Sequence, residues 1–304
     1  MTKLLFSDID GTLLRKDGTI SPTLARKLRE MGQAGHGMIL CSGRPLDGIL
    51  LVQSYLESLS IHFPYSYVIA NNGALVYDCN EKKAVLEDRL PIELIPRAQA
   101  LAKQYHVHLQ TYTDHEIVCE KETPELLHYQ THVKIPAIFA PDYTKALSRP
   151  PFKMLALSLD GSDALKQFRV QIQAALGDGV QTMFSGAGYL EIFSAQASKG
   201  NALRFLCDYL SVPVSDSIAV GDSENDIPML LAAGLGAAMQ NATETVKSSA
   251  GFITALDHEH DGLADRPAER TSLKGKLSEM KARVSGTPAG RDAVDKTRGK
   301  EEVI

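Results

Sequence analysis

Two aspartates separated by one residue stand near the start of the chain, in the stretch KLLFSDIDGTLL. Residues two apart on a β-strand point to the same side, so Asp8 and Asp10 would project together from the end of a strand over residues 3–7. Carboxylates this close repel each other unless a cation lies between them or one takes up a proton. The stretch therefore indicates either an acidic site that binds a cation or, as the structural alternative, a strand that ends in an Asp-Gly turn.

Two further stretches offer groups that can bind a phosphate. The first, MILCSGR, places the hydroxyl of Ser42 and the backbone N–H of Gly43 after an apolar strand, where a turn can hold a phosphate oxygen. The second, ASKGNALRFL, places Lys199 at the start of a helix, where its charge opposes the helix dipole. Lys199 is therefore either a solvated surface lysine or a cation that offsets a negative ligand.

The densest group of acids follows a later strand, in the stretch SIAVGDSENDIPML. Asp222, Asn225 and Asp226 stand there, ahead of a helix with a proline in its first turn. Helix capping explains one acid, but not several polar groups at the end of one buried strand. Together with Asp8 and Asp10 they supply a few water-accessible oxygen ligands, a set that suits Mg²⁺ bound to a substrate phosphate. The sequence thus predicts a magnesium site.

Alternating strands and helices would bring these residues to one place. Strands are expected within residues 3–9, 36–45, 66–78, 189–193, 217–226 and 235–239, and the first two helices within residues 21–35 and 46–59. Near-continuous apolar strands separated by helices indicate a parallel sheet covered on both faces, and ligands bind beyond the carboxyl ends of such strands. Asp8, Asp10, Ser42 and Asn72 all fall at those ends. We therefore predict an α/β protein with a Rossmann-like, doubly wound parallel sheet.

The pattern changes in the middle of the chain. Half-buried strands are expected at residues 106–113, 115–121, 152–160 and 180–185, with helices at 92–105, 124–132 and 162–176. Strand pairs with helices on one face indicate an α+β unit of its own. We predict a core domain at 1–80 and 189–267, an inserted cap domain at 81–188, and a charged, flexible tail at 268–304.

Composition narrows the classes of function. The 304 residues carry a net charge of -5, which gives no reason to expect nucleic acid or an anionic membrane as partner. The four cysteines form no C-x-x-C pair, which argues against a structural zinc site and fits a reducing cytosol. The first residues do not resemble a signal peptide, and the longest weakly polar run is too short to cross a bilayer. We expect a soluble, cytoplasmic protein.

Two histidine pairs could bind a metal by residue type alone. His106 and His108 would lie on one strand face, but no third ligand stands near them in the sequence. We expect them on the surface or in a pocket wall of the cap. His258 and His260 fall in an acidic loop and are expected to be solvated.

These motifs resemble those of the haloacid dehalogenase (HAD) superfamily of phosphohydrolases, and most closely its Cof-type branch with the α/β cap called C2B. The stretch DIDGTLL matches D-x-D-G-T, and CSGRP stands where T-G-R-P is usual, with Ser42 keeping the hydroxyl. The stretch SKG supplies the motif lysine, GDSENDIPML is close to G-D-x-x-N-D-x-x-M-L, and IANNGA also matches the branch. The resemblance covers residues 3–264, and the charged tail has no counterpart in it.

The resemblance implies a role for each matching residue. Asp8 resembles the nucleophile that forms an aspartyl-phosphate, and Asp10 resembles the general acid that later serves as base. Mg²⁺ would be held by the Asp8 carboxylate, the Asp10 main-chain carbonyl and Asp222, with Asp226 nearby. The phosphoryl oxygens would be bound by Ser42, the Gly43 amide, Lys199, Asn225 and the Ile9 amide. Arg44 and Asn72 would face the substrate or the cap.

The function that the resemblance implies is a Mg²⁺-dependent phosphatase of small phosphorylated metabolites, with sugar phosphates as the expected substrates. A phosphosugar mutase or a disaccharide-phosphate phosphatase of the same superfamily is the alternative among enzymes. A phospho-ligand sensor without turnover is the alternative outside enzymes, although a sensor has no need of both Asp8 and Asp10. We expect a monomer or a homodimer whose partner is the small-molecule substrate.

Overall fold

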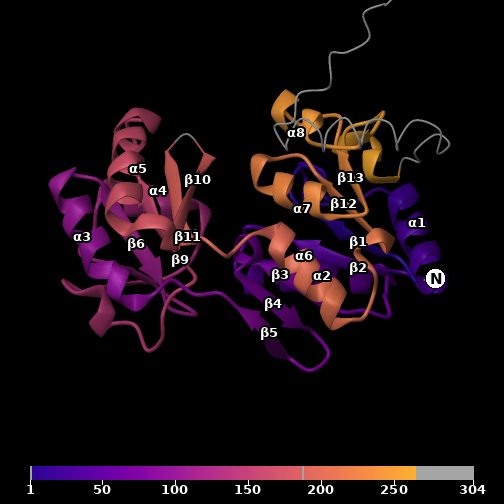
Figure 1. Cartoon of the computed structure of the whole chain (residues 1–304), viewed down its shortest axis with the longest axis horizontal. Helices are drawn as coiled ribbons and strands as arrows, with labels where there is room; N and C mark the ends of the chain where they lie inside the picture. Colours follow the sequence, from indigo (N-terminus) through magenta and orange to yellow (C-terminus); the bar gives the residue numbers. More distant parts are fainter. Residues whose placement is uncertain (1, 187, 265–304) are drawn as a thin grey trace, which may run out of the picture. The chain divides into compact units, whose positions relative to one another are not determined.

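The computed structural model describes residues 2–186 and 188–264, and the first of its two sheets has eight strands. Their order is β14-β13-β12-β1-β2-β3-β4-β5 (Figure 1). The strands are β1 (Leu4–Ser7), β2 (Gly37–Cys41), β3 (Tyr67–Ala70), β4 (Leu75–Asp78), β5 (Lys83–Glu87), β12 (Ser217–Gly221), β13 (Leu235–Ala238) and β14 (Phe252–Ile253). The neighbours from β14 to β3 are parallel, whereas β4 and β5 add an antiparallel edge.

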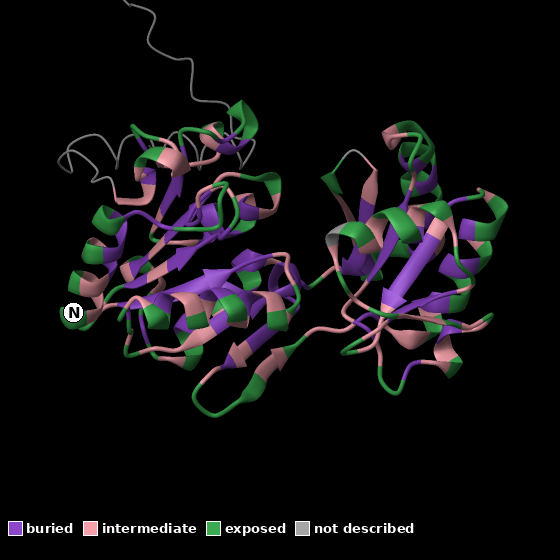
Figure 2. Cartoon of the chain, turned by 180° about the vertical axis from the view of Figure 1, so that it is seen from behind, coloured by how far each residue is buried: buried purple, intermediate pink, exposed green. Residues whose placement is uncertain are grey.

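Helices cover both faces of this sheet. They are α1 (Pro22–Gln33), α2 (Leu46–Ser58), α6 (Lys199–Tyr209), α7 (Ile227–Ala232) and α8 (Glu244–Ser248). On β2, Ile39 and Cys41 pack in one cluster with α6 and α7, while Met38 and Leu40 pack in another with α1 and α2. Every residue of β2 is buried, as expected for a strand covered on both sides (Figure 2). The predicted doubly wound α/β sheet is confirmed.

The second sheet has six strands in the order β10-β11-β9-β6-β7-β8. They are β6 (His108–Tyr112), β7 (Ile117–Cys119), β8 (Ala137–Phe139), β9 (Lys153–Leu157), β10 (Val180–Gly186) and β11 (Tyr189–Ser194), accompanied by α3 (Ile95–Gln104), α4 (Pro124–His132) and α5 (Ser162–Leu176). Side chains of α3 and α5 share one buried cluster with Leu109, Met154 and Ile192 of this sheet. All pairs are antiparallel except β7 with β8. The α+β character predicted for the middle of the chain is confirmed.

Short 3-10 turns complete the connections. They are η1 (Asn71–Gly73), η2 (Ile92–Leu94), η3 (Tyr143–Lys145), η4 (Gly177–Gly179), η5 (Val214–Asp216), η6 (Glu224–Asp226), η7 (His258–His260) and η8 (Gly262–Ala264). No helix within the described part of the chain is long and apolar enough to span a bilayer.

The structure corrects the sheet assigned to residues 189–193. The sequence places this apolar run in the parallel sheet, but it forms β11, which pairs antiparallel with β9 and β10. The strand is buried on both faces, and its sequence is therefore almost continuously apolar, as in a strand of a parallel sheet. Conversely, β5 falls in the stretch predicted to be cap, 81–188, but it belongs to the eight-stranded sheet. The domain limits remain predictions, and the predicted tail at 268–304 lies outside the described residues.

Candidate active site

The carboxyl ends of the parallel strands carry the predicted site residues to one edge of the eight-stranded sheet. Asp8 follows β1, Ser42 follows β2, Asn72 lies in η1 after β3, and Asp222 follows β12. The strands β12, β1, β2 and β3 are neighbours, so their ends lie side by side. This is the edge at which open α/β sheets bind ligands.

The side chain of Lys199 is completely buried and lies between two carboxylates. Its Nζ donates hydrogen bonds to Asp8 Oδ1 and to Asp226 Oδ1, each at 2.6 Å. It occupies the first turn of α6, where Ser198 caps the helix by accepting from the Asn201 N–H. A buried ammonium in this position needs its two carboxylate partners. The alternative of a solvated surface lysine is wrong.

Asp226 fixes the turn that follows β12. Its Oδ2 accepts the backbone N–H groups of Asp222 and Ser223, both at 2.9 Å, while Oδ1 accepts from Lys199. A Cβ at Gly221 would collide with the Asp226 side chain, so this approach requires glycine. Asp226 therefore holds both the turn and the lysine, and its role exceeds that of a helix cap.

The charges of the buried cluster do not balance. Burial and the nearby charge of Asp226 raise the pKa of Asp8 to about 8, against the opposing effect of Lys199. Burial also raises the pKa of Asp222, although the Thr12 hydroxyl donates to its Oδ1 at 2.9 Å. Burial lowers the pKa of Lys199, but Asp226 and Asp8 together outweigh it and the net shift is upward. Three carboxylates thus share one buried ammonium.

Additional positive charge would relieve this imbalance. Asp8, Asp222 and Asp226 can each direct one oxygen to a common place, within 4.8 Å of one another. Among the described residues they form the one such group of acidic, histidine or cysteine ligands. Three carboxylate oxygens this close together are a donor set that fits Mg²⁺.

Asp10 does not join this cluster, although it stands two residues from Asp8. β1 ends at Ser7, so the alternation of a strand does not continue through the two aspartates. Asp8 is buried, whereas the Asp10 side chain is 59% exposed. Its Oδ2 accepts from Arg44 Nε at 2.9 Å and its Oδ1 from Arg44 Nη2 at 2.6 Å. The expectation that the two carboxylates project together is wrong: Asp8 pairs with Lys199, which it shares with Asp226, and Asp10 pairs with Arg44.

Three of the predicted phosphate-binding residues, Ser42, Gly43 and Asn225, lie against Asn72. The Asn72 N–H donates to the Ser42 carbonyl at 3.1 Å, and its Oδ1 accepts from Asn225 Nδ2 at 3.0 Å. A Cβ on Gly43 would lie 2.9 Å from the same Oδ1, so Asn72 also packs against the Ser-Gly turn. Ile9 is completely buried beside Asp8 in the chain. The structure thus brings together residues that are far apart in sequence.

Two residues that were not predicted from the sequence, Thr12 and Glu191, make hydrogen bonds at the site. Thr12 bonds to Asp222, and it belongs to the D-x-D-G-T stretch, so the motif itself carried a signal for it. Glu191 of β11 accepts from Asn72 Nδ2 at 3.0 Å. Glu191 stands in an apolar strand without a recognisable motif, and no sequence signal pointed to it.

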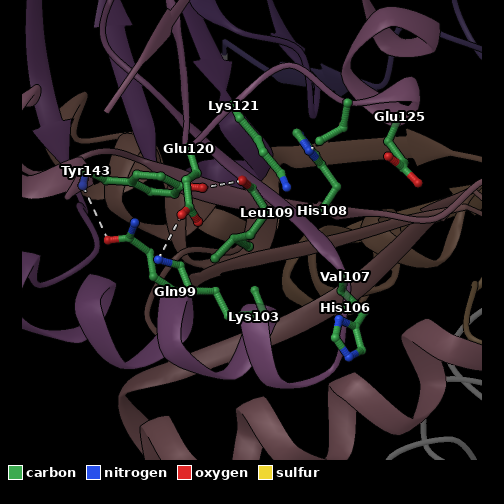
Figure 3. A pocket seen from close by; sticks show the side chains of 12 residues that line it. Gln99, Lys103, His106, Val107, His108, Leu109, Glu120, Lys121, Glu125 and Tyr143 are labelled. Atoms are coloured by element: carbon green, nitrogen blue, oxygen red, sulfur yellow. Dashed lines mark hydrogen bonds and ion pairs between the residues drawn. The ribbon is translucent and has the colours of Figure 1, made fainter. Parts of the chain in front are cut away.

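A cavity of about 390 Å³ lies elsewhere, on the six-stranded sheet and its helices (Figure 3). None of its lining residues is a predicted site residue. His106 and His108 both line it, so the expectation of a cap surface or pocket wall is confirmed, and neither belongs to a three-ligand metal group among the described residues. His106 lies in a turn before β6 rather than on the strand. The histidine of the strand, His108, bonds to Gln110 and Thr123.

Comparison with known proteins decides the family. The model of the haloacid dehalogenase-like hydrolases matches residues 5–266. The chain belongs to this family. The resemblance read from the motifs is therefore confirmed, and the two sheets are the core and the cap of a HAD hydrolase.

Named relatives and solved structures agree with this membership. The chain is 28% identical to the putative phosphatase YxeH of Bacillus subtilis over 265 residues, 86% of this chain and 95% of the relative. It is 26% identical to the pyridoxal phosphate phosphatase YbhA of Escherichia coli, covering 86% and 96% of the two chains. The crystal structure of a haloacid dehalogenase-like hydrolase from Bacteroides thetaiotaomicron superimposes with a TM-score of 0.75 at 28% identity, covering 87% and 97%. The predicted enzyme class, a phosphoric monoester hydrolase, is confirmed.

Proposed function

We propose that this HAD hydrolase is a Mg²⁺-dependent phosphatase of small phosphorylated metabolites that works through an aspartyl-phosphate. The observation that carries the proposal is the pairing of buried Asp8 with buried Lys199 beside Asp222 and Asp226. A carboxylate placed between a fixed ammonium and a divalent-cation site is kept ionised and aimed, as a nucleophile must be.

In the proposed reaction Asp8 is the nucleophile and Asp10 is the general acid and base. Asp10 enters the cycle protonated, which requires one of its two Arg44 hydrogen bonds to open. An Asp8 carboxylate oxygen attacks phosphorus, the bond from phosphorus to the leaving oxygen breaks, and Asp10 gives that oxygen its proton. Asp10 then takes a proton from a water molecule, which attacks the same phosphorus and breaks its bond to Asp8. Inorganic phosphate leaves and both aspartates return to their first state. The exposure of Asp10 suits this role, because it has to reach both the leaving group and water.

The metal would be held by the Asp8 carboxylate, the Asp10 main-chain carbonyl and Asp222, with Asp226 adjacent. When bound, Mg²⁺ supplies positive charge to the phosphoryl oxygens and to the nucleophile. Asp226 already accepts three hydrogen bonds, so we assign it mainly to holding Lys199 and the turn. Thr12 orients Asp222.

The transferring phosphoryl group would be bound by donors at the strand ends: Ser42, the Gly43 and Ile9 amides, Lys199 and Asn225. Phosphoryl transfer depends mostly on positioning and on stabilising charge, and fixed donors of this kind supply both. Lys199 is well placed to serve the nucleophile and the phosphoryl group together, since it is fixed against Asp8.

For the substrate we propose a small phosphorylated metabolite, with sugar phosphates tested first. YbhA is named a pyridoxal phosphate phosphatase, so the substrate panel should also include phosphorylated metabolites that are not sugars. Free thiols at all four cysteines agree with a cytoplasmic protein.

Hydrolysis of p-nitrophenyl phosphate tests the proposal. The purified chain should release phosphate with Mg²⁺, should stop in EDTA, and should recover on Mg²⁺ addition. Asp8→Asn keeps the side-chain shape but removes the attacking charge, so turnover should fall to background while the circular dichroism spectrum is unchanged. Near wild-type turnover by folded Asp8→Asn would refute the covalent mechanism.

A panel of phosphorylated metabolites then separates the alternatives. A phosphatase releases inorganic phosphate from its best substrate, whereas a mutase produces an isomeric phosphosugar and a sensor binds without producing either. Binding of panel compounds without any product would overturn the enzyme assignment.

A further inference from the structure

Glu191 reaches the candidate site from the other sheet. It lies on β11 and is only 7% exposed. Its Oε1 accepts from Lys153 Nζ on β9 at 3.0 Å, and its Oε2 accepts from Asn72 Nδ2 at 3.0 Å. A buried carboxylate is tolerated only with partners of this kind. Both oxygens of Glu191 are thus used, one by an ammonium and one by the amide of Asn72.

The charge of Glu191 determines which way the Asn72 amide points. An ionised carboxylate can only accept hydrogen bonds, so the NH₂ group of Asn72 must face it. The carbonyl oxygen of Asn72 therefore faces Asn225, whose Nδ2 donates to it at 3.0 Å. Asn72 is buried in a left-handed backbone conformation (φ 57°), which leaves little freedom to reorganise.

The same contacts set the orientation of Asn225. Because Asn72 presents an acceptor, the NH₂ group of Asn225 is held in the Asn72 contact, and its second N–H is left for another acceptor. The Asn72 amide also packs against Gly43, whose N–H belongs to the proposed phosphate site. A flipped Asn72 amide would present a donor to Asn225 and would turn the Asn225 oxygen into that contact.

We propose that Glu191 is a positioning residue for phosphate binding, which acts through Asn72 to keep the second N–H of Asn225 aimed at the phosphoryl oxygens. The proposal rests on the function proposed above. Lys153 pairs with the Glu191 carboxylate and holds it in place. A residue of the six-stranded sheet thereby sets the orientation of an amide at the edge of the eight-stranded sheet.

Glu191→Gln is the direct test, because a glutamine fills the same space and can still accept from Lys153 but lets the Asn72 amide turn. The inhibition constant of inorganic phosphate and the KM for p-nitrophenyl phosphate should both rise about tenfold or more, the size expected for one hydrogen bond to a charged group. Glu87→Gln is the matched control, since Glu87 also pairs with a cationic side chain, Arg89, but is itself exposed. It should leave both constants unchanged.

A double-mutant cycle distinguishes positioning from general damage. If Glu191 acts through Asn225, Glu191→Gln should add little to the phosphate inhibition constant in an Asn225→Ala background. Asn72→Ala interrupts the chain of contacts in the middle and should weaken phosphate binding by a similar factor, which also covers the case of a poorly folded Glu191→Gln.

Two failures are separable. Unchanged phosphate inhibition in folded Glu191→Gln, or full additivity with Asn225→Ala, overturns the positioning role while wild-type activity stands. Absence of hydrolysis and of phosphate binding in the wild-type chain overturns the proposed function itself.

Discussion

Asp10 and Arg44 form a two-pronged ion pair in which each carboxylate oxygen accepts one hydrogen bond, from Nε at 2.9 Å and from Nη2 at 2.6 Å. Such bidentate pairs fix orientation as well as charge. The Asp10 side chain is largely exposed, so the guanidinium supplies the orientation that packing does not. Arg44 in turn is tied to the Ser-Gly turn, because its backbone N–H donates to Ser42 Oγ at 3.1 Å.

Loss of the Asp10–Arg44 ion pair should slow the reaction without unfolding the protein. Arg44→Met leaves Asp10 free to rotate in water, and we expect kcat for a sugar phosphate to fall about 10- to 10²-fold, the range for small misplacements of a reacting group. Arg44→Lys keeps the charge but loses the fork, so it should recover only part of the rate. Steady-state kinetics measure both.

Arg26→Met is the matched control, because Arg26 forms an exposed ion pair with Glu30 within α1. It should leave kcat unchanged. An Arg44→Met variant with wild-type kcat would show that Arg44 does not orient Asp10 during turnover.

The sequence was informative where chemistry depends on residue type at strand ends. Asp8, Ser42 and Asp222 could be placed at one edge because parallel strands end at the same side of a sheet. Side-chain direction beyond a strand end could not be read in this way. β1 stops at Ser7, and the loop turns Asp8 inward to Lys199 and Asp10 outward to Arg44.

Burial of polar side chains and their long-range pairing could not be predicted from the sequence either. The motif predicted Lys199 as a phosphate-binding cation, but not its burial between Asp8 and Asp226, since nothing local indicates carboxylates from other segments. Glu191 looked like one polar position in an apolar strand. Its partners, Lys153 and Asn72, lie 38 and 119 residues away in the chain, so local periodicity carries no information about them.

Metal binding should stabilise the fold, because a divalent cation relieves the repulsion among Asp8, Asp222 and Asp226. Millimolar Mg²⁺ should therefore raise Tm in a thermal melt, by an amount that grows with concentration as expected for a ligand of the native state. Ca²⁺ should restore little activity, since it prefers looser and higher coordination.

Asp222→Asn provides the control for this stabilisation. It removes one charge while keeping an acceptor for the Thr12 hydroxyl, so most of the Mg²⁺-dependent rise in Tm should disappear. An unchanged rise in this variant would place the metal somewhere else on the protein.

His108 should make stability depend on pH. Burial lowers its pKa below the usual 6.5, against the weaker opposing effects of Gln110 and Glu125. Gln110 donates its NH₂ to Tyr112, so its carbonyl oxygen accepts from His108 Nε2 and the neutral ring satisfies both contacts. The unfolded chain then takes up a proton at a higher pH than the folded chain. The free energy of unfolding should fall as the pH drops from above 6.5 through the folded pKa.

Urea titrations at pH 7.5 and pH 5.5 measure this dependence. His108→Asn should lose less stability over the interval than the wild type, even though it starts from a lower value. His62→Asn, a change at an exposed histidine, should keep the wild-type dependence. A wild-type dependence in His108→Asn would mean that other groups control acid stability.

Asp10→Asn tests the proposed acid–base role directly. An alkoxide leaving group of a sugar phosphate needs a proton, whereas p-nitrophenolate leaves without one. If formation of the aspartyl-phosphate limits the rate, the variant should therefore lose more kcat/KM with the sugar phosphate than with the aryl phosphate. The gap should approach the ~10²–10⁴-fold typical of general acid–base catalysis.

Rapid-quench measurement of the phosphoenzyme separates the two half-reactions of Asp10→Asn. If breakdown of the intermediate limits both substrates, the two losses in turnover match and labelled Asp8 accumulates, because no base activates the water. If formation limits, the losses differ and little label is trapped. Equal losses without trapped phosphoenzyme fit neither case, and Asp10 would then serve the metal rather than the proton. The outcome is decisive because Arg44, not the metal cluster, holds the Asp10 carboxylate in the free enzyme.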